Sequence, residues 1–166
     1  EKLGFWKPIC VHHHLLQGLE KPAIWPIPKG KEKEAVASAK MSKSKPETCV
    51  FLYDSPEEIK QKIAKAFCPE KTIKFNPILD ICKHIIFRER KTLTIERPAK
   101  FGSTVEFQSY QELETTYRHG NLHPQDLKNA VAEELTKILE PVRTYFKNNR
   151  EAKECLNIVK NTETTR

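Results

Sequence analysis

The sequence contains no apolar run that approaches the roughly 20 residues of a membrane-spanning helix. It also shows no basic and apolar leader at its start, so nothing in it points to secretion. Of its 166 residues, 38% are hydrophobic and 31% are charged, which is the balance of a soluble globular protein. We therefore expect a cytoplasmic protein with no membrane partner, built as one core of ordinary size or as two small units.

Paired cysteines are also lacking. The chain has five cysteines, an odd number, and no two of them have CxxC spacing. This pattern disfavours both a zinc site of the usual cysteine spacing and a secreted disulfide framework. Most of the cysteines are expected to be buried as small apolar side chains. They are Cys10, Cys49, Cys68, Cys82 and Cys155.

Three adjacent histidines, His12 to His14, form the one run that suggests a metal site. Successive side chains of a strand point to opposite sides, so three neighbours do not converge easily on one ion. We therefore predict no metal site. The net charge is +7, from 29 basic and 22 acidic residues. This excess permits a polyanionic partner, and a solvated lysine-rich surface explains it equally well.

The first third of the chain has little helical periodicity. Residues 7 to 16 begin with a proline and carry apolar groups, a pattern that predicts a strand leaving a core. Residues 21 to 46 contain four prolines, a glycine and many lysines. They predict a long loop with a short helix near residues 35 to 39. Long ordered loops often carry function, and the pentapeptide KMSKS lies at the far end of this one.

The remainder predicts a mainly α fold of the α+β kind, with a short two-stranded element. Helices are expected where a capping residue precedes an apolar stripe, and strands where apolar residues alternate. The helices are predicted near residues 55–67, 76–86, 109–117, 124–141 and 152–159, and the strands at 93–95 and 105–107. Pro141 is expected to kink the longest helix because it lacks a backbone donor.

Several segments in a fixed order resemble one family. They read KMSKSKPE, DSPEEIKQKIAKAFCPE, NPILDICKHIIF, LTIERPAKFG, YQELE and LHPQDLKNAVAEELTKILEPVR. Together they resemble the C-terminal half of tyrosyl-tRNA synthetases of the archaeal and eukaryotic type, from about Lys7 to Phe146. The last segment is the most specific, because tryptophanyl-tRNA synthetases share the KMSKS loop but not that helix.

The resemblance implies two parts. Residues 1–54 would be the C-terminal remnant of a class I catalytic domain, with the last strand and KMSKS loop of a truncated Rossmann-type fold. Residues 55–166 would be a helical anticodon-binding domain. The family's early His-x-Gly-His motif does not occur in this sequence. We therefore expect the isolated chain to be inactive, with the missing half supplying the tyrosine pocket and most contacts of a homodimer.

The resemblance also implies a role for the KMSKS loop. A synthetase of this class joins tyrosine to ATP, supplied with Mg²⁺ as a substrate, and needs no tightly bound cofactor. Negative charge builds on the departing pyrophosphate, and a lysine ammonium can stabilise it. Lys40 and Lys43 would be the catalytic lysines, although many family members carry serine at the second position. Met41, Ser42 and Ser44 would complete this ATP-binding loop. His12 and Leu15, at the strand end, are further ATP-site candidates.

A second implied site reads the anticodon of the tRNA for tyrosine, whose first base is guanine. The two adjacent N–H donors of guanine suit a carboxylate, and Asp126 matches the family's aspartate for that role. Phe101 and His123 match its companions, one of which would stack on a base. Local alternatives stay open: Asp126 as a first-turn helix residue, His123 as a helix cap, and Phe101 as a core side chain.

Two other functions remain open at this point. The chain could be a non-catalytic tRNA-binding fragment, or it could belong to the tryptophan-specific relatives. The sequence preceding Glu1 would separate the first alternative from the ligase, and the identity of the tRNA that binds would separate the second.

Overall fold

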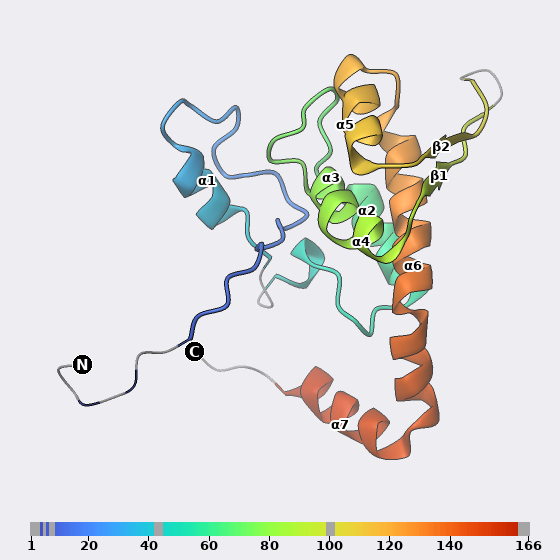
Figure 1. The fold of residues 1–166 in the computed structure, drawn as a ribbon. Coiled ribbons are helices and arrows are strands. Elements are labelled where there is room, and N and C mark those ends of the chain that lie inside the picture. The colour runs from blue at the N-terminus through green and yellow to red at the C-terminus, as the bar shows by residue number, and fades with distance from the viewer. Residues whose placement is uncertain (1–3, 5, 7–8, 42–44, 99–101, 163–166) are drawn as a thin grey trace.

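The fold is mainly helical with one two-stranded antiparallel sheet, as predicted (Figure 1). A computed structural model describes residues 4, 6, 9–41, 45–98 and 102–162. The helices are α1 (Glu32–Ser38), α2 (Pro56–Lys65), α3 (Pro77–Ile81), α4 (Phe87–Glu89), α5 (Tyr110–His119), α6 (Pro124–Asn148) and α7 (Arg150–Asn161). A 3₁₀ turn spans Pro46–Thr48, a π-helical turn spans Cys82–Ile86, and the strands are β1 (Leu93–Ile95) and β2 (Val105–Phe107).

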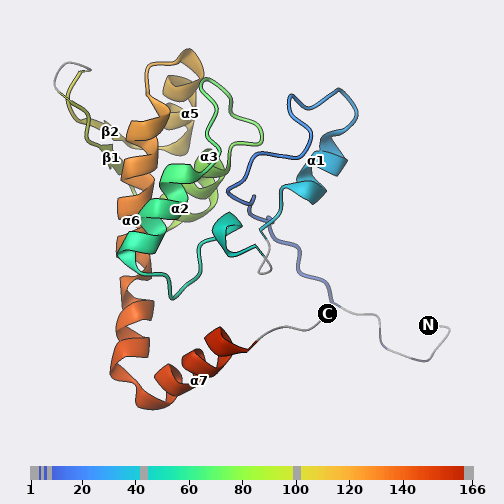
Figure 2. The same cartoon turned by 180° about the vertical axis from the view of Figure 1, so that it is seen from behind.

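The core is centred on the packing of α2 against the first half of α6. Ile59 and Ile63 on α2 are fully buried, as are Leu127 and Val131 on α6. Burying a side chain of this size stabilises the fold by about 1.5–3 kcal/mol. Figures 1 and 2 show α6 along one side of this helical body, with α1 and its long loop on the other side.

The start of α2 is fixed by a capping box, as its sequence predicted. Ser55 Oγ accepts from Glu58 N at 3.2 Å, and Glu58 Oε2 accepts from Ser55 N at 2.7 Å. The Ser55 backbone donor holds the pKa of Glu58 below its usual value, because it stabilises the carboxylate. The chain therefore changes at residue 55 from irregular backbone to the helical body.

The sheet and α5 position the start of α6. Leu93 pairs with Phe107 in the antiparallel register, and both side chains are buried. Ser109 caps α5 by accepting from Glu112 N at 3.3 Å, while the Glu112 carboxylate accepts from Gln108 N at 2.9 Å. The cap is thus confirmed, although the glutamate bonds one residue earlier than a standard capping box requires.

Helix α6 begins at Pro124 and continues through Pro141 to Asn148. His123 is its N-cap, and its side chain accepts from Gln125 N. The helix therefore extends beyond the predicted end at residue 141, and the expected kink at Pro141 stays a prediction.

The predicted strand at residues 7–16 is wrong for its described part. Residues 9–16 form no strand, and the side chains of Ile9 and Val11 are 96% and 86% exposed. A strand needs a neighbour for its backbone groups, and no described strand lies beside this segment. The predicted loop at 21–46 is confirmed in its outline, with α1 a few residues earlier than expected.

The prediction for the cysteines holds only in part. Cys49 and Cys82 are buried, Cys68 is half-buried, and Cys10 and Cys155 are exposed. The two exposed thiols lie in segments that pack outside the core. None of the described helices is both long and apolar enough to cross a membrane.

The interface of α2 with α6 should dominate stability. Replacing Ile63 with alanine leaves a cavity in this interface, so the free energy of unfolding should fall by about 2–5 kcal/mol. Ile158→Ala is the matched control, because the Ile158 side chain is 66% exposed on α7. It should change stability by less than about 0.5 kcal/mol. Urea denaturation of both variants tests this, and equal losses would contradict the location of the core.

Candidate functional site

The loop that contains KMSKS is held at its base by three consecutive residues. Gln17 forms an antiparallel bridge with Lys40, and Gly18 N donates to the carbonyl of Ala39. On the far side of the loop, Leu19 N donates to the carbonyl of Thr48 at 2.8 Å. One short stretch of backbone therefore fixes both ends of the loop.

Gly18 allows this close approach. A Cβ atom at this position would lie 3.0 Å from the Ala39 carbonyl oxygen and 3.1 Å from that of Lys40. Both neighbours are backbone atoms that cannot rotate away, so a larger residue would push the two segments apart. The base of the loop thus depends on a glycine that the sequence analysis did not single out.

Leu19 connects the loop base to the helical body. Its side chain is 2% exposed and belongs to the main core, and its carbonyl accepts from Phe67 N at 2.7 Å, just beyond α2. A second link lies after the loop, where Lys62 on α2 contacts Asp54 at 2.6 Å. Asp54 also accepts from Phe51 N at 2.8 Å, so the chain leaving the loop is fixed before α2 begins.

The predicted loop residues fall partly within the described structure. The Lys40 side chain is exposed and Met41 is half-buried. Ser42, Lys43 and Ser44 lie outside the described residues. A shallow hollow of about 160 Å³ lies beside the loop base, lined in part by Lys21, Lys40 and Lys45. Exposed lysines around a small hollow can bind an anion such as a phosphate group.

The two other ATP-site candidates lie upstream of the loop base. His12 is exposed, and the Leu15 side chain is 58% exposed. Leu15 is only two residues before the Gln17 bridge, so it lies near the same end of the loop. Among the described residues, neither side chain makes a polar contact with Lys40. The structure therefore places both candidates in one segment with the loop base without bringing them into a formed site.

A second hollow, of about 450 Å³, lies at the start of α6. It joins the chain after β1, the turn between α5 and α6, and the segment after α2. Its lining consists of Glu70, Lys71, Arg97, Pro98, Gly120, Asn121, Leu122, His123, Pro124 and Asp126. Both described members of the predicted anticodon set, His123 and Asp126, are therefore brought together here, while Phe101 lies outside the described residues.

His123 contributes an imidazole ring to this hollow, and Asp126 contributes a carboxylate. His123 Nδ1 accepts from Gln125 N at 3.1 Å, so its Nε2 carries the proton in the neutral ring. The Asp126 side chain is half-buried. Within the described part of the chain no donor contacts its carboxylate. The helix-cap role for His123 is therefore real, and the first-turn position of Asp126 leaves both of its oxygens available to a ligand.

Arg97 is a member of this hollow that sequence reasoning missed. Its guanidinium donates to the Ser103 carbonyl at 3.0 Å and to the Asn121 carbonyl at 3.2 Å. It thereby ties the chain between β1 and β2 to the turn before α6. The signal in the sequence was weak, because an arginine after a strand has many possible roles.

Lys71 was also missed, and its position depends on Gly120. A Cβ atom at Gly120 would lie 2.4 Å from Lys71 Cε, so the lysine side chain passes directly over the glycine. Gly120 ends α5 in the left-handed region, with φ of 80°.

Lys128 does not line this hollow and donates to the Ala64 carbonyl at 2.9 Å. This bond joins α6 to α2 and gives Lys128 a structural role.

Comparison with known proteins identifies consistent relatives. Residues 33–140 match the family described as tRNA synthetases class I (W and Y). The chain is 54% identical over 156 residues to a tyrosine–tRNA ligase of Pyrococcus abyssi, covering 93% of this chain and 42% of that protein. A tyrosine–tRNA ligase of Aeropyrum pernix is 48% identical over 144 residues, covering 86% of this chain and 40% of that protein.

Solved structures agree with these relatives. The chain is similar to a tyrosyl-tRNA synthetase of Pyrococcus horikoshii in complex with L-tyrosine, with a TM-score of 0.80 and 53% identity, covering 86% of this chain and 39% of that one. It is also similar to a tyrosyl-tRNA synthetase of Aeropyrum pernix, with a TM-score of 0.76 and 39% identity, covering 97% and 42%. The chain thus spans about two fifths of the length of these relatives.

The contacts of Arg97 should determine the order of the second hollow. Replacing it with glutamine removes the charged donor that joins two chain segments, which should cost about 1–2 kcal/mol in urea denaturation. Thermolysin should cleave the chain between β1 and β2 faster in this variant. Arg118→Gln is the control, because among the described residues Arg118 pairs only with Glu114, on the surface of α5. Unchanged cleavage in Arg97→Gln would show that the loop is held by other contacts.

Proposed function

The chain belongs to the class I tRNA synthetases of the tryptophan and tyrosine group, and we propose that it is the part of a tyrosine–tRNA ligase that carries the ATP-phosphate loop and the anticodon-reading domain. The observation that carries this proposal is the identity of 54% to a tyrosine–tRNA ligase over 93% of the chain. The tyrosine-specific relatives favour tyrosine over tryptophan as the amino acid. Because the chain spans 42% of that relative, the complete reaction belongs to the whole protein.

The proposed division into parts follows the contacts at residue 54. Residues 1–54 would complete a Rossmann-type catalytic domain. Residues 55–166 would form the anticodon-binding domain, beginning at the capping box of α2. The exposed Ile9 and Val11 side chains support this arrangement, since the rest of a larger catalytic domain would cover them. A homodimer of the complete protein is part of the same proposal.

The KMSKS loop would act on the phosphates of ATP. Attack of the tyrosine carboxylate on the α-phosphate expels pyrophosphate, and the charge on the departing group grows in the transition state. Lys40 and Lys43 would neutralise it more strongly in the transition state than in the ground state, which raises the rate. Ser42 and Ser44 would donate hydroxyl hydrogen bonds, and the half-buried Met41 would anchor the loop.

The loop base supports this role in a simple way. The loop must open to admit ATP and close around it, so its ends have to stay fixed while its centre moves. Gln17, Gly18 and Leu19 hold those ends through backbone contacts. His12 and Leu15 belong to the same segment and would lie beside the nucleotide, which enters with Mg²⁺ as a substrate.

The hollow at the start of α6 would hold the first anticodon base. A guanine presents two adjacent N–H donors on its Watson–Crick edge, and the Asp126 carboxylate can accept both. His123 or Phe101 would stack on the base, as aromatic side chains do with unpaired RNA bases. Lys71 and Arg97, which line the same hollow, add positive charge that would attract the RNA backbone.

The loop lysines can be tested in the complete ligase that contains this chain. Lys40→Ala or Lys43→Ala should slow tyrosine-dependent ATP–pyrophosphate exchange by about 10²- to 10³-fold, as for removal of one donor to a developing charge. The affinity for tyrosine should change little. Lys31→Ala is the matched control, because Lys31 lies outside the lysine-lined hollow and pairs with Glu34 at 2.8 Å. Near-normal exchange in both loop variants would exclude the proposed role, and a defect only in Lys40→Ala would limit it to that residue.

The role of Asp126 can be tested by binding of the tRNA for tyrosine, with guanine or cytosine at the first anticodon position. Wild type should prefer guanine by about 1–3 kcal/mol, as for a good bidentate base contact. Asp126→Ala should bind more weakly and lose most of this preference. If both proteins show the same penalty for cytosine, Asp126 serves only the helix end.

Two controls complete this measurement. Lys71→Ala should weaken both tRNAs alike, since a phosphate contact carries no base preference. The tRNA for tryptophan should bind more weakly than the tRNA for tyrosine. The opposite order would assign the chain to the tryptophan-specific relatives.

A further inference from the structure

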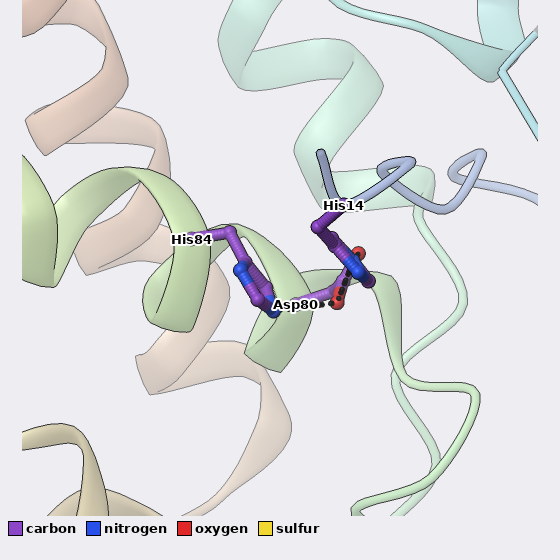
Figure 3. Close-up of side chains that lie close together, drawn as sticks. All are labelled: His14, Asp80 and His84. Atoms are coloured by element: carbon purple, nitrogen blue, oxygen red, sulfur yellow. Dashed lines mark hydrogen bonds and ion pairs between the residues drawn. The ribbon is translucent and has the colours of Figure 1, made fainter. Parts of the chain in front are cut away.

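Three side chains from two distant parts of the sequence meet beside the loop base. His14 lies in the segment before Gln17, Asp80 is in α3, and His84 is in the π-helical turn (Figure 3). Asp80 Oδ1 lies 2.9 Å from His14 Nε2 and 3.8 Å from His84 Nε2. One ligand atom from each residue lies within 4.8 Å of the other two. The histidine run therefore contributes one ring here, and its two partners come from the helical body.

The dimensions of this cluster suit a small divalent ion. Ligand atoms at about 2.0–2.1 Å from a tetrahedral zinc lie roughly 3.3 Å apart. The two measured separations, 2.9 and 3.8 Å, lie on either side of this value. The His14 and His84 rings stack with centroids 3.8 Å apart, so one ring must turn for both nitrogens to face one ion. His14 has room to do so, because 42% of its side chain is exposed.

Asp80 is already oriented for such a role. Its Oδ2 accepts from Gln17 N at 3.0 Å, a contact that fixes the carboxylate in the way that outer contacts fix metal ligands. Lys83 lies on the same turn as His84. Its ammonium group lies over the Tyr110 ring, 5.4 Å from the ring centroid, and so points toward Tyr110. A hollow of about 530 Å³ adjoins the three residues and leaves space for a water molecule as a fourth ligand.

We propose that His14, Asp80 and His84 bind one zinc ion, which ties the segment before the KMSKS loop to the helical body. Two imidazole nitrogens and one carboxylate favour zinc over Mg²⁺ or Ca²⁺, which prefer ligand sets made of oxygen. Our prediction of no metal site considered three adjacent histidines as the ligand set. The zinc site avoids that geometric obstacle because it uses only one of them.

Zinc binding to the 166-residue chain tests the proposal without any tRNA or ATP. Cys10→Ser and Cys155→Ser should be present in every protein compared, because exposed thiols also bind zinc. Equilibrium dialysis should then give one zinc ion per chain. Bound Co²⁺ should give the absorption of a site with nitrogen and oxygen ligands. Zinc should also raise the melting temperature in proportion to the logarithm of its concentration above Kd.

The variants separate ligation from packing. His84→Phe keeps a ring against His14 but removes the nitrogen, and Asp80→Asn keeps an acceptor for Gln17 N while removing the charge. Each should weaken zinc binding at least about 10-fold, the smaller loss seen for residues that only support a ligand. His13→Gln is the matched control, because His13 is an exposed neighbour in the same run, and its one hydrogen bond within the described structure is to the His14 carbonyl. It should bind zinc like the parent protein.

Three results would overturn the proposal. The first is the absence of stoichiometric zinc binding in the parent protein. The second is equal weakening by His13→Gln and His84→Phe, which would indicate a non-specific histidine-rich surface. The third is a melting temperature that responds to pH but not to zinc, which would make the cluster an ion pair of His14 with Asp80. If Asp80→Asn proves unfolded, the comparison of zinc binding by His84→Phe and His13→Gln still tests the proposal.

Discussion

Backbone pairing at residues 17–19 is the constraint on which the candidate catalytic loop depends. The Leu19 backbone N–H donates to the Thr48 carbonyl, at the end of the loop, and the Leu19 carbonyl accepts from Phe67 N, next to α2. The Leu19 side chain is buried in the core. Leu19 therefore attaches the loop before Thr48 to the helical body through its backbone and its buried side chain. Backbone bonds of this kind do not depend on side-chain identity, except at Gly18, where a Cβ would lie only 3.0 Å from the Ala39 carbonyl oxygen.

Two carboxylates strengthen this attachment on opposite sides of the loop. Asp80 bonds the backbone of Gln17 upstream, and Asp54 pairs with Lys62 downstream. The Asp54 side chain is 3% exposed, and a buried carboxylate without a partner would be costly, so this pair fixes a specific geometry rather than adding much stability. The hollow at the start of α6 is organised differently. There the cation of Arg97 gathers neutral carbonyl groups, which leaves the Asp126 carboxylate to meet a ligand.

Local chemistry decided which features could be predicted from the sequence. Ser55, Asn76 and Ser109 each precede a helix and each accept from its first turn, because capping is a contact between residues close in sequence. The antiparallel pair β1 and β2 followed for the same reason. The segment at residues 9–16 failed because a strand depends on neighbours that its own residues do not specify.

The candidate site shows the same limit. His123 and Asp126 were identified through a family pattern, and the structure brings them to one hollow. Arg97, and the cluster of His14 with Asp80 and His84, depend on contacts between residues that are far apart in sequence. No local pattern signals the approach of Arg97 to Asn121, or of His14 to the pair of Asp80 and His84. Lys128 is a further example, because its partner is the Ala64 carbonyl of α2.

The unequal burial of α6 has a consequence for how the protein opens. All fully buried residues of this 25-residue helix lie between Leu127 and Leu135, while Tyr145 near its end is 58% exposed and α7 buries none of its residues. The distal half of α6 and α7 should therefore behave as a separate cooperative unit, whose amide hydrogens exchange through local unfolding at a lower free energy than the core. Thermal fluctuation at the C-terminal end can then occur without disturbing the hollow at the other end of the same helix.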